Sequence, residues 1–381
     1  MDLRPTDEHE LLRRSVREFA ETEIRPHVMA WDEAQKFPLS LLPRLAALGL
    51  TGIQLSEEYG GAGLSAIEYC ICIEELARVD PSIALSVAAH NGLCMAHLAM
   101  FGSEAQKQTF LPPLASGTAL GGWALTEANA GSDAGAMRTT AVKDGRGWVL
   151  NGSKQFITHG TMAATLVVMA VTDRTQSRRG ISAFVVTRGT RGLSAGKKED
   201  KLGMRASDTS EVLLQDCRVD ADAMVGAEGE GFVGAMQVLD AGRIGIAALA
   251  VGLAQGAYEA ARRHALERRQ FGQPIAHFQA IRWKLADMYT RIEAARLLTY
   301  RAAWMRDQRI ERTSAESSIA KLYSSEIAVR AADECVQIHG GYGFVKDYPA
   351  EKYFRDVKLC TIGEGTSEIQ RLVIARHLLG R

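Results

Sequence analysis

The chain has 381 residues, of which 46% are hydrophobic and 24% are charged. Its 45 basic and 45 acidic residues cancel, so the charge gives no reason to expect nucleic acid or an anionic membrane surface as a partner. The length favours two or three domains, and we expect no apolar run near the roughly 18 to 20 residues that span a bilayer.

The first eight residues are acidic and polar, unlike a secretory signal or an Arg-rich transit peptide. We therefore expect a cytoplasmic protein, while a processed form from an organelle matrix stays open. The six cysteines are scattered, and neither they nor the nine histidines show the spacing of a metal site. Buried free thiols in a reducing compartment are the expected interpretation.

Residues 1–120 are predicted to form a helical domain. Apolar residues from Leu11 to Ile24 recur near helical spacing, behind a possible cap at Thr6 or Asp7. Further helices are expected over residues 39–48, 66–79, 83–101 and 103–111.

Residues 121–232 change to short β-rich runs separated by turns. Strands are expected at 121–125, 139–143, 147–151, 166–171, 181–186 and 211–219. The segment Asp144-Gly145-Arg146-Gly147 predicts a hairpin turn between two of them. Strands at this spacing indicate a small antiparallel barrel or sandwich rather than βαβ units.

Residues 233–381 return to long helices, expected over 246–267, 275–306, 314–339 and 369–379. Their apolar stripes predict an antiparallel four-helix bundle. The whole chain is therefore predicted to be an α+β protein with domains at 1–120, 121–232 and 233–381.

One motif in the chain imitates a dinucleotide-binding fingerprint. Residues 229–234 match G-x-G-x-x-G, which should follow a hydrophobic strand within a βαβ unit. The segment before it, Asp220 to Ala223, is polar, and helices follow it. We expect these glycines to form a linker into the third domain.

Glu364 is the first candidate for chemistry, because glycine flanks it on both sides. Small neighbours let a substrate approach closely, and a general base that removes a carbon-bound proton needs that access. On these residues alone, a surface glutamate at the start of a helix is the alternative.

Four further stretches carry candidate binding groups. A loop at 123–133 offers hydroxyls and backbone donors to a flat heterocycle or a phosphate, although an ordinary capped loop would look the same. Phe156 and Thr158 would share one face of a strand, either against a ring system or in ordinary packing. Glycines at 340–343 suit a pyrophosphate or a helix C-cap. Asp240 and Arg243 share a helix face, where a ligand contact and a surface ion pair are both possible.

Together these stretches resemble the acyl-CoA dehydrogenase family. Trp123 to Asp133 is similar to its first signature, Gln337 to Asp356 to its second, and Glu364 to Arg371 to the segment with the catalytic base. The resemblance covers nearly the whole chain, and residues 239–247 look most like the short-chain (butyryl-CoA) branch. It implies a homotetramer that binds FAD non-covalently, takes an acyl-CoA substrate and uses an electron-transfer flavoprotein as its partner.

The resemblance also assigns roles by position. The residues that it places at FAD within one subunit are Trp123, Leu125, Thr126, Ser132, Phe156, Thr158, Thr366 and Glu368. Those that would reach FAD from a neighbouring subunit are Arg268, Phe271, Gln279, Gln337 and Gly341. Those that would contact acyl-CoA are Ser132, Asp240, Arg243 and Gly365.

By this resemblance, Glu364 would remove the α-proton of the thioester while hydride passes from the β-carbon to flavin N5, giving a trans-2-enoyl-CoA. Some relatives carry their base at the position of Gly242, so that alternative base is absent here. A flavin oxidase or monooxygenase on the same fold is the alternative function, although such relatives often lack the carboxylate. A non-catalytic scaffold that retains the fold is a third hypothesis.

The chain departs from the family pattern at three places. Gly363 stands where a Tyr often precedes the base, which predicts a roomier pocket near the α-carbon that admits branched acyl groups. Phe156 stands where a Trp is common, so one N–H donor is lost. Ala128-Asn129 replaces a frequent Pro-Gly, which leaves the conformation of that loop open.

Overall fold

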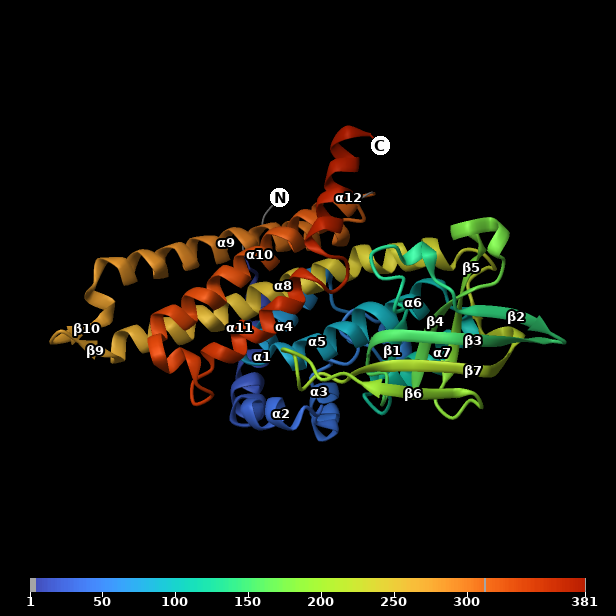
Figure 1. Cartoon of the computed structure of the whole chain (residues 1–381), viewed down its shortest axis with the longest axis horizontal. Coiled ribbons are helices and arrows are strands. Elements are labelled where there is room, and N and C mark those ends of the chain that lie inside the picture. Colours follow the sequence, from blue (N-terminus) through green and yellow to red (C-terminus); the bar gives the residue numbers. More distant parts are fainter. Residues whose placement is uncertain (1–4, 312, 381) are drawn as a thin grey trace.

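The computed structural model describes residues 5–311 and 313–380. The expectation about a leader peptide falls partly on residues 1–4, which lie outside the described residues. The chain begins with helices, continues with a sheet and ends with longer helices (Figure 1). This order confirms the predicted α+β class, whereas the division at residues 120 and 232 stays a prediction.

The first part is helical, as predicted. Its helices are α1 (Asp7–Phe19), α2 (Val28–Ala34), α3 (Leu42–Ala47), α4 (Ala66–Val79), α5 (Pro81–Ala89), α6 (Ala96–Phe101) and α7 (Glu104–Ala115). Thr6 caps α1 by accepting a hydrogen bond from the His9 N–H, which is the predicted start signal. The single helix expected over 83–101 is instead α5, a π-helical segment His90–Met95, and α6. Such π-helical turns often occur at functional sites.

The middle part is one sheet of eight strands. They are β1 (Gly121–Ala124), β2 (Thr140–Asp144), β3 (Gly147–Thr158), β4 (Thr165–Val171), β5 (Ile181–Thr187), β6 (Leu193–Lys198), β7 (Thr209–Asp220) and β8 (Met224–Val225). The order is β6-β7-β3-β2-β4-β5-β8, with β1 beside β4. Asp144 pairs with Gly147 across the predicted hairpin turn.

Most neighbouring strands pair antiparallel, as expected, but β4 pairs in parallel with both β1 and β2, which was not expected. Strand propensity marks where strands form, but it does not encode which partner a strand finds at long range. The short strands β6 and β8, at the two ends of the order, were not predicted. The expected barrel or sandwich remains a prediction.

The last part contains α8 (Gly231–Glu267), a two-stranded ribbon of β9 (Arg269–Gln270) and β10 (Gln273–Pro274), α9 (Gln279–Asp307), α10 (Ser314–His339), α11 (Ala350–Asp356) and α12 (Ser367–Leu379). Two of the glycines expected in a linker, Gly231 and Gly234, are helical residues of α8. A Cβ atom on Gly231 would lie 2.5 Å from the carbonyl carbon of Ser182, so this glycine allows α8 to pack against β5. The expected four-helix bundle remains a prediction.

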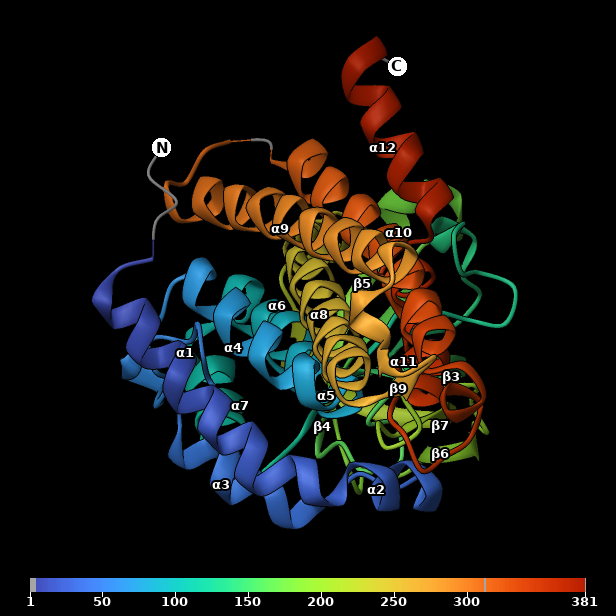
Figure 2. The same cartoon turned by 90° about the vertical axis from the view of Figure 1, so that its left-hand side faces the viewer.

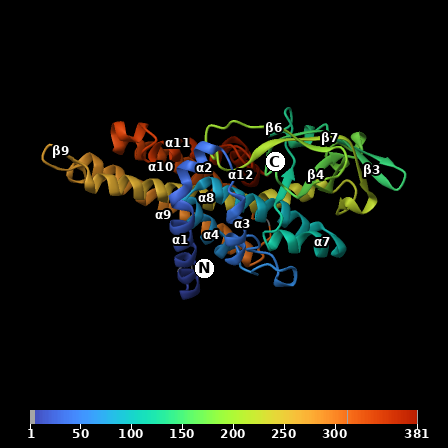
Figure 3. The same ribbon diagram turned by 90° about the horizontal axis from the view of Figure 1, so that it is seen from below.

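Helix α8 runs through the centre of the molecule and carries much of its core (Figure 1). Its residues from Ile246 to Leu253 are no more than 2% exposed where they are hydrophobic. Helices α4, α9 and α10 pack against it, and the sheet covers the end of the molecule opposite the β9–β10 ribbon (Figures 1 and 3). Viewed end-on, α12 stands away from the other helices (Figure 2).

Two apolar stretches, Pro81–Phe101 and α8, are long enough to cross a membrane, each with a mean hydropathy of 1.4. The expectation that no run approaches this length is therefore wrong, because it overlooked runs in which Ala and Gly separate the larger apolar residues. In both stretches 72% of the apolar window is buried inside the protein. All six cysteines are buried free thiols, as predicted.

Candidate functional site

Glu364 lies in a tight turn just before α12. Its φ is 54°, and the following Gly365 has a φ of 96°. A left-handed backbone is uncommon for a residue with a side chain and costs on the order of 1–3 kcal/mol. Residues held in such conformations cluster at active sites, so the backbone itself marks Glu364 as a functional candidate.

Buried side chains fix this turn from two helices. Lys321 of α10 donates from Nζ to the carbonyl oxygen of Gly365 at 2.6 Å, and Gln370 of α12 donates from Nε2 to the same oxygen at 2.9 Å. Both side chains belong to residues that are 0% exposed. Glycine is favoured at position 365, because its φ of 96° is a backbone conformation that residues with a side chain rarely adopt.

The carboxyl group of Glu364 faces α8. A Cβ atom on Gly242 would lie 2.1 Å from Oε2 of Glu364, so the carboxyl uses the space that this glycine leaves. Within the described part of the chain, Oε2 has no hydrogen-bond partner, although it is shielded from solvent. Burial raises the pKa of Glu364 to about 7, while Lys321 and Arg243 act in the opposite direction. A carboxyl that titrates near neutral pH suits general-base catalysis.

Asp240 and Arg243 form an ion pair on one face of α8. Arg243 is only 5% exposed, so this is not the solvated surface pair that stood as the alternative. Asp240 also accepts a hydrogen bond from the Ser314 hydroxyl. Nε of Arg243 is buried without a partner among the described residues, which leaves one donor for a polar group of a ligand.

A buried ion pair supports the loop after β1. Lys154 is 0% exposed, and its Nζ lies 2.8 Å from Oε1 of Glu127 and 3.0 Å from the carbonyl oxygen of Leu125. Glu127 also accepts from the N–H groups of Arg138 and Thr139. Burial lowers the pKa of Lys154 to about 8, and Glu127 opposes that change. The pair therefore ties both ends of the loop to β3.

The predicted flavin-contact residues of the sheet lie along this loop and the end of β3. Phe156 is 62% exposed with a φ of 59°, in an irregular stretch of β3–β7 pairing between Lys154 and Ile157. Such irregularities re-aim side chains, here an aromatic ring toward solvent. The N–H of Gln155 donates to the carbonyl of Thr126, so the loop and β3 are joined directly. The other members are Trp123 and Leu125 at β1, Ser132 in the exposed loop and Thr158 at the end of β3.

Two predicted residues lie at the start of α12, close in sequence to Glu364. The Thr366 hydroxyl caps the helix by accepting from the N–H of Ile369 at 3.3 Å. Glu368 is exposed in the first turn. Both therefore lie on the same short segment as the candidate base.

A separate set of predicted residues lies at the other end of the molecule. These are Arg268 after α8, Phe271 between β9 and β10, Gln279 at the start of α9, Gln337 in α10 and Gly341 after it. Phe271 is 93% exposed, and the guanidinium of Arg268 lies 5.2 Å from the ring centroid of Tyr342. The β9–β10 ribbon and the sheet occupy opposite ends of the chain (Figure 1), so one chain does not bring this set to the set around Phe156.

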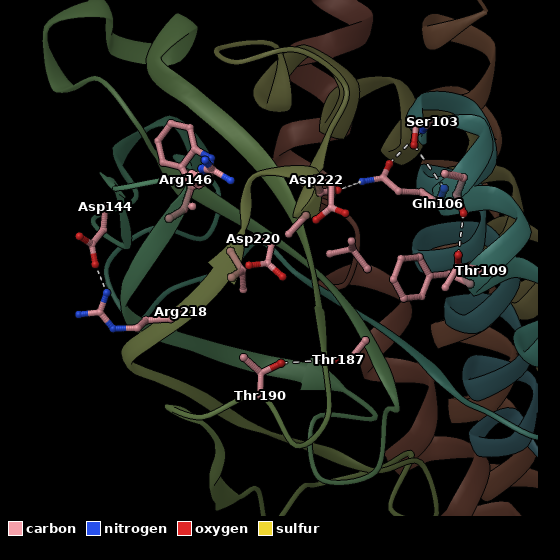
Figure 4. A pocket seen from close by; sticks show the side chains of 17 residues that line it. Ser103, Gln106, Thr109, Asp144, Arg146, Thr187, Thr190, Arg218, Asp220 and Asp222 are labelled. Carbon is pink, nitrogen blue, oxygen red and sulfur yellow. Dashed lines mark hydrogen bonds and ion pairs between the residues drawn. The ribbon is translucent and has the colours of Figure 1, made fainter.

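A hollow of about 560 Å³ between α7 and the sheet is lined by other residues. Acidic and basic side chains mix along it, among them Asp144, Arg146, Arg218 and Asp222 (Figure 4). None of the predicted catalytic, cofactor or substrate residues lines this hollow. The predicted site residues therefore lie outside this hollow, and Glu364 and the loop after β1 stay the candidates for the site.

Comparison with known proteins decides the family. Models of the N-terminal, middle and C-terminal domains of acyl-CoA dehydrogenase match residues 6–118, 122–217 and 229–379. Over 98% of its length the chain is 46% identical to a short-chain specific acyl-CoA dehydrogenase of Clostridium acetobutylicum, of which it covers 99%. The chain belongs to the acyl-CoA dehydrogenase family.

Other members of the family are similarly close. A mitochondrial short-chain specific acyl-CoA dehydrogenase of Rattus norvegicus is 46% identical over 97% of the chain and 90% of its own length. The solved butyryl-CoA dehydrogenase of Megasphaera elsdenii has a TM-score of 0.97 at 42% identity, with both chains fully covered. A chain in a solved structure named for the electron transferring flavoprotein of Acidaminococcus fermentans has a TM-score of 0.98 at 44% identity, again over both whole chains.

The family resemblance predicted from the motifs, including its short-chain character, is thus confirmed. The protein is an oxidoreductase of the acyl-CoA dehydrogenase family, whose members depend on FAD. Its own residues fit that group. The ring of Phe156 is open to solvent, Ser132 is exposed in the loop after β1, and a Cβ atom on Gly131 would meet nothing within 4 Å. Such a surface accommodates a flat heterocycle and its polar edge.

Sequence reasoning missed several residues that shape the site of this acyl-CoA dehydrogenase. Glu127 lies in the loop at 123–133 and Lys154 lies two residues before Phe156, but a lysine in a strand gives no sign that it is buried. Lys321 had one signal, because serines lie three and four residues before and after it, on its own face of α10. Gln370 had no signal of burial in the sequence, since a glutamine in a terminal helix is usually exposed to solvent.

Proposed function

We propose that the protein dehydrogenates an acyl-CoA thioester between its α- and β-carbons, with Glu364 as the base that removes the α-proton. The observation that carries this proposal is the solvent-shielded, unpartnered Oε2 of Glu364 beside Gly242. Its pKa of about 7 means that about half of the carboxyl groups are ionised near neutral pH. A base with that pKa is both available and strong enough to accept a proton.

The backbone at Glu364 supports a second role. Its N–H donates to no described backbone carbonyl, whereas Gly363 N–H is engaged by Leu359. A free N–H directed at the thioester carbonyl would stabilise the negative charge that develops on its oxygen when the α-proton leaves. Lys321 and Gln370 hold the turn, so this donor does not have to be ordered during the reaction.

The chain supplies the binding surface for FAD and the substrate. Phe156, Thr158 and the loop from Leu125 to Ser132 would hold the flavin within one subunit, and Asp240 and Arg243 would contact the polar part of acyl-CoA. FAD bound there supplies the acceptor for the β-hydrogen. An electron-transfer flavoprotein would then receive the electrons. The similar chain in the structure named for the electron transferring flavoprotein of Acidaminococcus fermentans supports this partner.

The set at Arg268 and Phe271 would reach the FAD of a neighbouring subunit, and we propose a homotetramer. The exposure of large apolar side chains supports this assembly: Phe271 is 93% exposed, Phe344 86% and Leu379 of α12 76%. Sedimentation at several protein concentrations tests it, and a monomer at micromolar concentration would contradict it. The bacterial relatives favour a cytoplasmic location.

Gly363 extends the proposal to branched acyl groups. A Cβ atom there would meet only Leu359, at 3.5 Å from its carbonyl oxygen and 3.6 Å from Cδ1, which is ordinary contact. A side chain is therefore tolerated at this position, and its absence leaves space beside the base. We expect Gly363→Tyr to reduce activity on isobutyryl-CoA more than on butyryl-CoA, with Gly363→Ala as the matched control.

The experiment that tests the function is anaerobic mixing of the yellow protein with acyl-CoA thioesters. Butyryl-CoA is expected to bleach the flavin and to yield the trans-2-enoyl-CoA, and palmitoyl-CoA is expected to be poor. Rapid oxygen consumption without an added acceptor would favour the oxidase alternative. A protein that binds FAD but is bleached by none of the thioesters would refute the proposal.

A further inference from the structure

Helix α8 carries three parts of the proposed substrate site in order along its axis. Asp240, a proposed acyl-CoA contact, comes first, and Gly242, which faces the Glu364 carboxyl, comes second. Gly245 follows three residues later on the same side of the helix, about 4.5 Å farther along its axis. Exposure falls in the same direction: Asp240 is half-buried, whereas Gly242 and Gly245 are buried.

Tyr69 of α4 occupies the space beside Gly245. A Cβ atom on Gly245 would lie 2.7 Å from the Tyr69 hydroxyl oxygen and 3.2 Å from Cε1 of its ring. The hydroxyl also lies 3.2 Å from the Cβ position of Gly92, and it donates to the carbonyl of Ala88 at 3.4 Å. Two glycines on two different elements therefore make room for one ring, which is 3% exposed.

The residues that surround this ring adjoin those that surround the Glu364 carboxyl. Leu93, next to Gly92 in the π-helical segment, places Cδ2 3.4 Å from the Cβ position of Gly242, the same position that meets Oε2 of Glu364. Leu93 is half-exposed although both of its neighbours in the sequence are buried, so the surrounding residues do not fully enclose its side chain. Burial, and after it the charge of Glu364, raise the pKa of Tyr69 well above its ordinary value, which agrees with a short separation.

We propose that Tyr69 closes the inner end of the acyl pocket, and that Gly92 and Gly245 exist to admit its ring, so that the site accepts only short acyl chains. This inference rests on the proposed function of Glu364. The α-carbon must lie at the carboxyl and the CoA must leave toward Asp240, so the acyl tail extends toward Gly245. About one helical turn of α8 separates the base from the ring, which leaves room for a few carbon atoms.

The test compares Tyr69→Ala and Tyr69→Leu, which shorten the side chain, with Tyr69→Phe, which keeps the ring. Flavin content of each purified variant shows whether it has folded. The rate of anaerobic flavin bleaching is then measured with butyryl-, hexanoyl- and octanoyl-CoA at subsaturating concentrations. Each methylene that gains a buried position is worth about fourfold in this rate.

We expect Tyr69→Ala to raise the hexanoyl-to-butyryl ratio by about tenfold or more, Tyr69→Leu to raise it less, and Tyr69→Phe to keep the wild-type ratio. Wild-type protein that takes octanoyl-CoA as readily as butyryl-CoA overturns the inference alone, as does an unchanged ratio in both shortened variants. Absence of bleaching by any thioester in the wild-type protein overturns the proposed function, and the inference with it.

Discussion

Replacing Lys154 with methionine should destabilise the protein and weaken its binding of flavin. The change leaves the carboxylate of Glu127, in the loop after β1, without its ion-pair partner. The ammonium group of Lys154 is fully buried and lies 2.8 Å from Oε1 of Glu127. Methionine has a similar length, so the change removes the charge and its donors without emptying the core.

The structure sets the size of the effect. Removing one partner of a buried ion pair generally costs about 3–5 kcal/mol, because the other charge is left unpaired. Glu127 retains hydrogen bonds from the N–H groups of Arg138 at 2.6 Å and Thr139 at 2.9 Å, which favours the lower end, about 3 kcal/mol. Adding Glu127→Gln removes the unpaired charge. The double variant should therefore regain about 1–2 kcal/mol of unfolding free energy relative to Lys154→Met.

The assay is denaturant unfolding of wild type, Lys154→Met and the double variant at one protein concentration, together with the dissociation constant for FAD. Lys143→Met is the matched control, since Lys143 pairs with Glu228 at 3.0 Å but is 67% exposed in its side chain. Such a surface pair should contribute less than about 1 kcal/mol. Equal losses in Lys154→Met and Lys143→Met, or a double variant no more stable than Lys154→Met, would refute the reasoning.

Three further outcomes follow from the turn at Glu364. In the wild type, kcat/KM should rise with pH through about 7, because the pKa of Glu364 is raised by burial and only its ionised form accepts a proton; a rate already at its plateau at pH 5 would contradict this. Lys321→Met should move that rise upward by about one pH unit, since Lys321 holds the pKa down, and an unchanged midpoint would exclude the effect. Gly242→Ala should keep the fold but slow flavin reduction about 10²-fold, because its Cβ would displace the end of a flexible side chain, Oε2 of Glu364. Wild-type rates in that variant would show that the carboxyl does not need its observed position.

Much of the fold could be predicted from the sequence because helix and strand periods are local properties. The hairpin at residues 144–147 and the helix α10 form where the pattern placed them. The parallel pairing of β4 with β1 and β2 could not be predicted, because strand partners are chosen by tertiary packing. The π-helical segment at residues 90–95 was missed for a similar reason, since nothing in its local pattern differs from an α-helix.

At the site, Glu364 could be found because glycines surround it and because its segment resembles a known motif. Its left-handed backbone and its contact with Gly242 could not, since both depend on how the segment before α12 packs against α8 and α10. Lys321 and Tyr69 illustrate the same limit. The serines around Lys321 distinguish it in the sequence and Tyr69 is ordinary there, but only three-dimensional packing shows that Lys321 holds the turn and that Tyr69 faces Gly245.

The measurement that tests the central claim most directly is the rate at which butyryl-CoA bleaches the flavin of Glu364→Gln, compared with wild type under anaerobic conditions. Glutamine keeps the shape of the side chain but cannot accept the α-proton. We predict that the variant retains FAD, binds butyryl-CoA, and is bleached at least about 10²-fold more slowly. Bleaching within about threefold of the wild-type rate, well inside the effect expected of a lost general base, would contradict the account.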